Sequence, residues 1–122
     1  MQQKLGVAAG RGPLALGSRA IVAAAMRNRR CLRGRYNGGS VMIAPYMLYE
    51  RHEILHLAAL TLSRDGKPGR AEKLSVYRLP GLTDIELTGE LFEPAQEMLD
   101  THQHPVDRLL GSAIGASDQT NR

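Results

Sequence analysis

The sequence predicts a mainly β fold, a small sheet or barrel of about five strands with a helix before it. Between residues 31 and 92, short alternating apolar segments recur at intervals of about 10–12 residues and are separated by turns containing Gly, Asn, Asp or Pro. Residues 18–30 instead carry apolar side chains at helical spacing. The chain has 122 residues, so we expect one domain, at 18–94, between a lead-in at 1–17 and an extension at 95–122.

The expected helix covers residues 18–30. Ser18 is suited to the N-cap position, and Ile21, Ala24 and Ala25 repeat on one side of the helix. Arginines fill its last turn, where cations interact favourably with the helix dipole. The glycine-rich residues before it show little periodicity, which predicts a flexible lead-in.

The five strands are expected within residues 31–92. Asn37-Gly38, the strongest short hairpin signal, joins the first two. Pro45 interrupts the second strand, "SVMIAPYMLYE", which predicts an edge or a bulge at that point. The third strand starts near Ile54 and is apolar on both faces until the turn "RDGKPG". The segments "EKLSVYRLPGL" and "TDIELTGELF" alternate as the fourth and fifth strands.

The extension at 95–122 has a different pattern. Pro94 suits a helix start, and the following residues predict one or two short helices broken near Pro105. Residues 116–122 are polar, which predicts a loose tail.

Charge is distributed unevenly along the chain. The net charge is +4, but residues 1–49 contain eight Lys and Arg and no acid, whereas residues 50–122 contain all twelve Asp and Glu. A basic front half favours contact with phosphate or another anion. The alternative is a solvated basic face that the acidic half balances in space.

Cysteine content and hydropathy limit the class of protein further. Cys31 is the only cysteine, which excludes an intrachain disulfide and a cysteine-rich zinc module and favours a reducing, cytoplasmic compartment. We interpret Cys31 as a small buried apolar side chain. No apolar run approaches the roughly 20 residues that span a bilayer, so no membrane contact is expected. The first residues are too interrupted by Gly, Pro and Arg for a signal peptide.

His52-Glu53-Ile54-Leu55-His56 matches the zinc-peptidase pattern H-E-x-x-H. On a helix, His52 and His56 would share a zinc ion and Glu53 would act as general base. On a strand the two histidines would share a face about 13 Å apart, too far for one ion. The flanks "PYMLYER" and "SRDGKPG" are typical of a strand and a turn, and no third ligand follows at a short spacing. A strand is therefore expected, and a zinc-dependent hydrolase stays as the alternative function.

Several segments follow one another in the order of a known family. They are "AIVAAAMRNRRCLRGRYNGG", "VMIAPYMLYER", "ILHLAAL", "VYRLPGL" and "TDIELTGELFEP". Over about 75 residues, from Ala20 to Pro94, the chain resembles a WYL domain. The family's naming Trp-Tyr-Leu falls on Leu55, His56 and Leu57, and its later Asp and Arg fall on Pro80 and Gly81. These departures put family-type ligand contacts in doubt.

The resemblance implies an Sm-like (SH3-like) barrel with a preceding helix and a role as a non-enzymatic regulatory module. WYL domains are typical of bacterial transcription factors and defence proteins, and are thought to bind nucleic acid or nucleotide-like ligands in a basic, aromatic pocket. The chain has no room for a helix-turn-helix domain beside the barrel. A transcriptional output would then need a DNA-binding partner chain. A pure interaction module that forms a homodimer or docks onto such a partner is compatible with the same fold. No cofactor and no metal are expected.

The candidate ligand-binding residues combine arginines with aromatic rings. On the first strand, two guanidinium groups and a tyrosine ring suit a phosphate and a base, and a solvated edge strand is the other reading. Tyr46 and Tyr77 suit either base stacking or packing in the core. His56 suits either a polar contact with a ligand or a core position in which its ring is hydrogen-bonded. His102 and His104 form a His-x-His that we interpret as incidental. The predicted site is Arg33, Arg35, Tyr36, Tyr46, His56, Tyr77 and Arg78.

Overall fold

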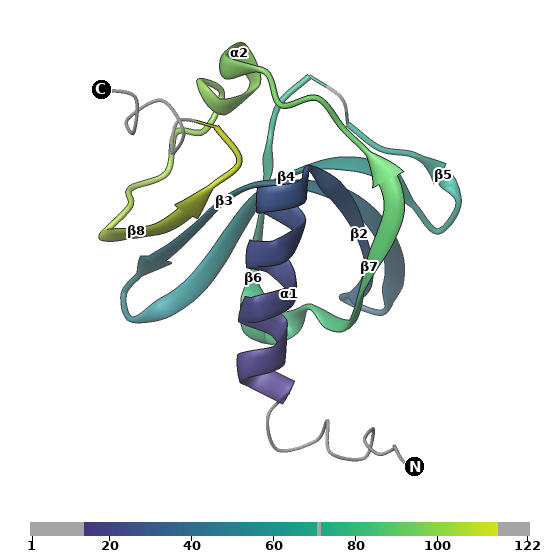
Figure 1. Cartoon of the computed structure of the whole chain (residues 1–122), viewed down its shortest axis with the longest axis horizontal. Helices are drawn as coiled ribbons and strands as arrows, with labels where there is room; N and C mark the ends of the chain where they lie inside the picture. Colours follow the sequence, from purple (N-terminus) through teal and green to yellow (C-terminus); the bar gives the residue numbers. More distant parts are fainter. Residues whose placement is uncertain (1–13, 71, 115–122) are drawn as a thin grey trace.

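The computed structural model describes residues 14–70 and 72–114, and it shows one helix in front of a set of strands (Figure 1). The mainly β class and the leading helix are therefore confirmed. The elements are α1 (Leu14–Asn28), β2 (Arg30–Tyr36), β3 (Gly39–Arg51), β4 (Ile54–Arg64), β5 (Lys67–Pro68), β6 (Ser75–Arg78), the 3-10 turn η2 (Leu79–Gly81), β7 (Thr83–Leu91), α2 (Gln96–Leu99) and β8 (Arg108–Ser112).

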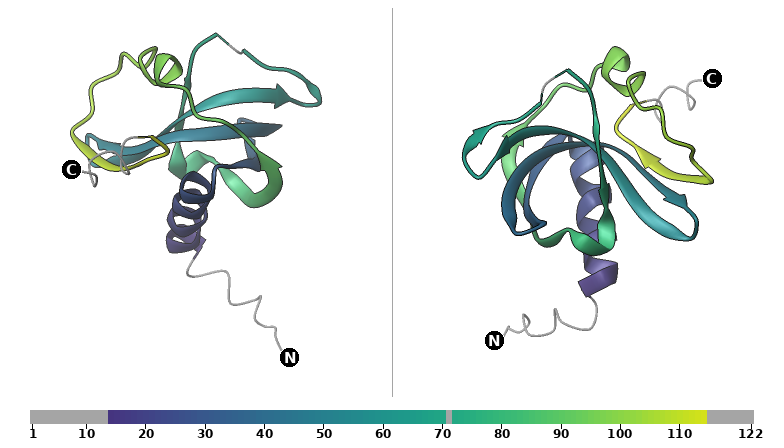
Figure 2. Two further views of the ribbon diagram at one scale, coloured as in Figure 1. Left: turned by 45° about the horizontal axis from the view of Figure 1, so that its top comes forward. Right: turned by 180° about the vertical axis from the view of Figure 1, so that it is seen from behind.

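The strands form one antiparallel sheet in the order β5-β4-β3-β2-β7, with β6 also paired to β4 and β8 also paired to β3. The sheet curls into a half-barrel, and α1 lies across its concave side (Figures 1 and 2). We call this the helix side of the sheet and the opposite face the outer side. In the described ranges no helix has the length and apolarity needed to cross a membrane.

Pro45 lies inside a central strand, although proline cannot donate a backbone hydrogen bond. Along one edge β3 pairs with β2 through residues 39–43 and with β8 through residues 47–50, so Pro45 falls where the partner changes. Along the other edge, the register with β4 shifts between Pro45 and Met47. The predicted bulge at Pro45 is confirmed, and the missing N–H falls where the ladder is interrupted.

Two tight turns shape the hairpins. Asn37 and Gly38 have φ of 50° and 81°, as the Asn-Gly signal predicts for a type I′ turn. His52 and Glu53 form the second turn, with φ of 53° and 63°. The expectation that His52 stands on a strand beside His56 is therefore wrong for His52. Its backbone N–H donates to the Asp107 carboxylate at 2.8 Å, which holds the turn.

Helix boundaries differ from the prediction. The structure starts α1 at Leu14, about one turn before the predicted cap Ser18, because Leu and Ala extend the helix and Gly17 does not interrupt it. The helix ends at Asn28 rather than Arg30, since Arg29 adopts a φ of 56° and begins the turn into β2. The predicted lead-in and tail fall mostly or wholly on residues 1–13 and 115–122, outside the described residues.

The C-terminal extension is not wholly helical. It holds the short helix α2, but the second predicted helix is wrong, because residues 108–112 form the strand β8. Beyond Pro45, β3 has an edge that β2 leaves unpaired, and pairing with β8 satisfies its backbone groups. The fourth predicted strand is shorter than expected and covers only Ser75–Arg78.

Side-chain alternation gives the sheet an apolar core on each side. On the helix side, buried residues such as Val22, Leu32 and Leu57 pack together. On the outer side, Tyr49 and Leu74 are buried against Met98 and Leu99 of α2 among others. Both faces of β4 are buried as predicted, and each core contributes on the order of 25 cal/mol per Å² of apolar surface.

Cys31 belongs to the outer core and is fully buried, as predicted. Burial and the nearby Glu90 carboxylate raise the pKa of its thiol. The thiol is thus held in its protonated, unreactive form.

Candidate anion-binding site

Two of the predicted site residues, Arg33 and Arg35, lie on β2 and make only local contacts. The Arg33 guanidinium forms an exposed ion pair with Glu86 of β7 at 3.2 Å. Arg35 Nη2 donates to the Gly38 carbonyl at 3.3 Å, across the adjoining turn. Alternation along β2 places both arginines on the face opposite Tyr36. The structure therefore does not bring these two guanidinium groups and the Tyr36 ring together on one face.

Tyr77 belongs to the helix-side core, and Tyr36 is partly buried against that core. Their rings meet edge to face at 4.8 Å, and the Tyr36 hydroxyl accepts a hydrogen bond from the Arg78 backbone N–H at 3.0 Å. The Tyr77 hydroxyl is hydrogen-bonded to the side chain of Thr61, and burial raises its pKa. Arg64, which the sequence prediction omitted, donates to the Tyr36 carbonyl at 3.0 Å. Both tyrosine hydroxyls hold strands together here.

Tyr46 lies apart from this pair, in the outer core. Its hydroxyl accepts a hydrogen bond from the Ala95 backbone N–H at 3.1 Å, and its ring lies 5.7 Å from that of Phe92. These contacts fix the segment before α2 against β3. Tyr46 is a packing residue in this structure.

His56 and Arg78 do meet, as direct cross-strand partners of β4 and β6. Alternation puts both on the outer side, because their neighbours Leu57 and Tyr77 belong to the helix-side core. His56 Nδ1 lies 2.9 Å from the Ile54 carbonyl oxygen, which can only accept. Nδ1 therefore carries the proton in the neutral ring, and Nε2 remains as an acceptor.

His56 begins a row of aromatic rings on the outer side. It stacks on Tyr49 at 5.4 Å with an interplanar angle of 15°. The loop after α2 brings the His102 ring edge to face with the Tyr49 ring, at 5.1 Å between ring centroids. The His104 ring follows, with its centroid 5.5 Å from that of His102. The His-x-His that we interpreted as incidental thus belongs to an ordered ring cluster.

A polar pocket of about 520 Å³ lies at the end of this row. It opens between the loop that precedes β6 and the loop that follows α2. Two permanent cations and two imidazoles contribute to its wall, and no carboxylate of the described residues does. The lining residues are Arg70, Lys73, Leu74, Ser75, Val76, Thr101, His102, Gln103 and His104.

No acidic side chain in the described part of the chain forms an ion pair with the cations of this pocket. Across residues 14–70 and 72–114, ion pairs join only Arg33 to Glu86 and Arg108 to Glu50. Arg70 and Lys73 therefore keep their positive charge available to a ligand. Burial, and then the charge of His104, lower the pKa of His102, so its ring is neutral in the free protein near pH 7.

Some buried polar atoms on β3 and in the loop after α2 have no hydrogen-bond partner among the described residues. In the described part of the chain they are Tyr49 Oη, Arg51 Nε, and Nδ1 and Nε2 of His102. Burial raises the pKa of Tyr49, and the nearby positive charge of Arg51 partly offsets this. Buried polar groups are normally paired with protein, water or ions, and leaving one unpaired costs about 1–3 kcal/mol. Of these residues only His102 lines the pocket, so its ring nitrogens are the buried polar atoms that a ligand bound there could pair.

The zinc-peptidase pattern does not assemble a metal site. His52 and Glu53 form the β3–β4 turn, both side chains are exposed, and only His56 lies on the following strand. The helical geometry on which the zinc alternative depended is absent from this segment. Within the described ranges, no group of three or more His, Cys, Asp or Glu side chains is arranged to hold a metal ion.

Comparison with known proteins adds no relative to this picture: no family model, no curated protein and no solved structure matches the chain.

Proposed function

We propose that the chain is a non-enzymatic sensor module of WYL type, which binds a phosphate-bearing, nucleotide-like anion in the outer-side pocket. The observation that carries this proposal is a wall with Arg70, Lys73, His102 and His104 and no carboxylate. A volume of about 520 Å³ suits a ligand of nucleotide size, since small-molecule sites span about 300–1,000 Å³.

The side chains match the chemistry of a phosphate group. An arginine fork can donate two parallel hydrogen bonds to phosphate oxygens, and a lysine supplies a compact point charge. The imidazole of His102, unpaired and neutral, gains a partner when an anion arrives and can take up a proton beside it. The exposed ring of His104 offers a face on which a base can stack.

The architecture supports the WYL resemblance in outline. A curled sheet with one helix on its concave side has the general plan of the Sm-like barrel that the resemblance implies. His56, at the position of the family's tyrosine, lies in the ring row that leads to the pocket. In this proposal, ligand binding is passed to a DNA-binding partner chain and so contributes to transcriptional regulation in the cytoplasm.

The test is calorimetric titration with ATP and, separately, with a short single-stranded oligonucleotide at low salt. We expect ATP to bind and the double variant Arg70→Ala/Lys73→Ala to lose at least about tenfold in affinity, because two charge-assisted contacts disappear. Arg19→Ala/Arg27→Ala is the matched control, with the same charge change at two exposed positions of α1.

The alternatives give different results in the same titrations. Binding that is lost in Arg33→Ala/Arg35→Ala and kept in Arg70→Ala/Lys73→Ala would move the site to β2 and refute the pocket assignment. Absence of ATP binding at low salt would also refute it. Tighter binding of the oligonucleotide than of ATP, with a steep salt dependence, would point to nucleic acid as the ligand.

A further inference from the structure

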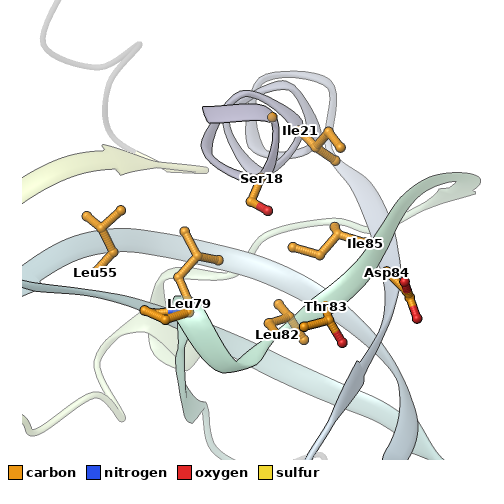
Figure 3. Close-up of a pocket in the computed structure, with 10 residues that line it drawn as sticks. Ser18, Ile21, Leu55, Leu79, Leu82, Thr83, Asp84 and Ile85 are labelled. Atoms are coloured by element: carbon orange, nitrogen blue, oxygen red, sulfur yellow. The ribbon is translucent and has the colours of Figure 1, made fainter. Parts of the chain in front are cut away.

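A second cavity lies on the helix side of the sheet, away from the basic pocket. It measures about 530 Å³, is open to solvent on one side, and is lined by residues of α1, β4, η2 and β7 (Figure 3). A Cβ atom added at Gly17 would meet no described residue within 4 Å, so none of the described residues closes the cavity beside the helix. The lining residues are Gly17, Ser18, Ile21, Leu55, Leu79, Pro80, Leu82, Thr83, Asp84 and Ile85.

The chemistry of this cavity is the opposite of that of the basic pocket. Its walls are mainly leucine, isoleucine and proline side chains, and in residues 14–70 and 72–114 no lysine, arginine or histidine lines it. The only carboxylate, that of Asp84, points away from the space, whereas the Ser18 side chain points into it (Figure 3). A ligand here would be desolvated against apolar groups, and the hydroxyls of Ser18 and Thr83 are the only side-chain hydroxyls among the described lining residues.

We propose that this cavity binds an uncharged, largely apolar small molecule that acts as an effector of the basic pocket. The effector role rests on the proposed function, and the binding itself does not. A charged ligand is disfavoured, because no described lining residue is cationic, the Asp84 carboxylate points away from the space, and burial of an unpaired charge is costly. The volume is that of a small-molecule site, and residues from four elements contribute to its walls.

The turn η2 connects the two sites physically. Leu79 and Pro80 of η2 line the cavity. Gly81 packs on the Tyr36 ring so closely that an added Cβ would lie 3.3 Å from Tyr36 Cε1. The residue before η2, Arg78, is tied through its N–H to the Tyr36 hydroxyl and faces His56 across the sheet. A ligand that shifts η2 therefore shifts β6, which also lines the basic pocket through Ser75 and Val76.

Nile red, an uncharged dye that fluoresces in apolar surroundings, tests the binding step with the whole chain. We expect saturable fluorescence with the unmodified protein and at least about a tenfold loss of affinity in Ser18→Phe, whose ring fills the cavity. Ala20→Phe, at an exposed position of the same helix, is the matched control and should bind as before. Equal affinity in Ser18→Phe, or no saturable signal with the unmodified protein, overturns the proposal. Ser18→Leu replaces Ser18→Phe if circular dichroism shows that the latter does not fold.

Two further measurements separate this inference from the proposed function. Arg70→Ala/Lys73→Ala should bind Nile red with unchanged affinity even where ATP binding is lost, because the dye has no charge. Saturating Nile red should change the affinity for ATP by at least about threefold if the cavity is an effector site. An unchanged ATP affinity would refute the effector role.

Discussion

The two sides of the sheet use the same strands for different purposes. On β4, Leu55 and Leu57 face the helix side, whereas His56 and Ala58 face the outer side. The helix side is covered mainly by α1, which satisfies most of its own backbone groups and contributes an apolar stripe. The outer side is covered by α2 and by irregular loops, which bring polar side chains that the core cannot satisfy. Polar binding chemistry therefore collects where a loop, rather than a long helix, covers a sheet.

The largest contrast is expected in stability. Leu57→Ala removes a fully buried side chain from the helix-side core and should cost about 2–5 kcal/mol. Leu60→Ala, on the outer side of the same strand, removes a partly exposed side chain and should cost distinctly less. Urea denaturation measures both values. Equal losses would mean that the two sides contribute alike to stability.

Removal of a tyrosine hydroxyl should have opposite consequences on the two sides. In Tyr36→Phe the Arg78 N–H loses its acceptor, so we expect a loss of about 1 kcal/mol. In Tyr49→Phe a buried hydroxyl without a partner disappears, so stability should stay the same or rise in the absence of ligand. Thermal denaturation of both variants is the measurement. A clear loss in Tyr49→Phe would show that its hydroxyl is paired in solution.

The outer side should also respond to pH through His102, whose pKa in the folded protein lies below its ordinary value of 6.5. Because the unfolded chain binds the proton more readily, the stability is fully present above pH 6.5 and declines as the pH falls from 6.5 towards the folded-state pKa. His102→Gln should flatten this decline. Urea midpoints between about pH 7.5 and 5.5 give the comparison. Identical pH profiles would assign the decline to other groups.

The smallest effect is expected for the exposed pair of Arg33 and Glu86, which lies in neither core. Exposed ion pairs contribute roughly 0–1 kcal/mol, so Arg33→Ala should lie within about 0.5 kcal/mol of the unmodified protein. Urea denaturation at low and high salt measures this. A larger loss would indicate that Arg33 supports the β2–β7 pairing through more than its charge.

Local signals in the sequence were enough for most of the strands. Asn37-Gly38, Pro45 and the turn after Arg64 each depend on the chemistry of a few neighbouring residues, and each lies where it was expected. The alternation of β7 was predicted less well. Register shifts between β2 and β7 bury Thr88, whose hydroxyl donates to the Cys31 carbonyl at 2.8 Å, and leave Leu87 41% exposed. Sequence periodicity carries no sign of such bulges.

The candidate site was harder to predict, because it depends on contacts between distant segments. His56 and Arg78 were named from the sequence, and the pairing of β4 with β6 brings them together. Arg70 and Lys73 come from one loop and His102 and His104 from another, so neither pair has a pattern that reveals the other. The role of β8 was missed for the same reason, since its pairing depends on an edge of β3 that Pro45 leaves open.

The position of Pro45 also orders events during synthesis and folding. The hairpins β2–β3 and β3–β4 join neighbouring segments, so they can form early and at low entropic cost. The second half of β3 pairs early with β4 on one edge, but its other edge must wait for residues 108–112, whose pairing closes a loop of about sixty residues. The loop with His102 and His104 lies just before those residues, so the basic pocket is completed only when almost the whole described chain has been made. A truncated or stalled chain would therefore contain the hairpins without a finished binding site.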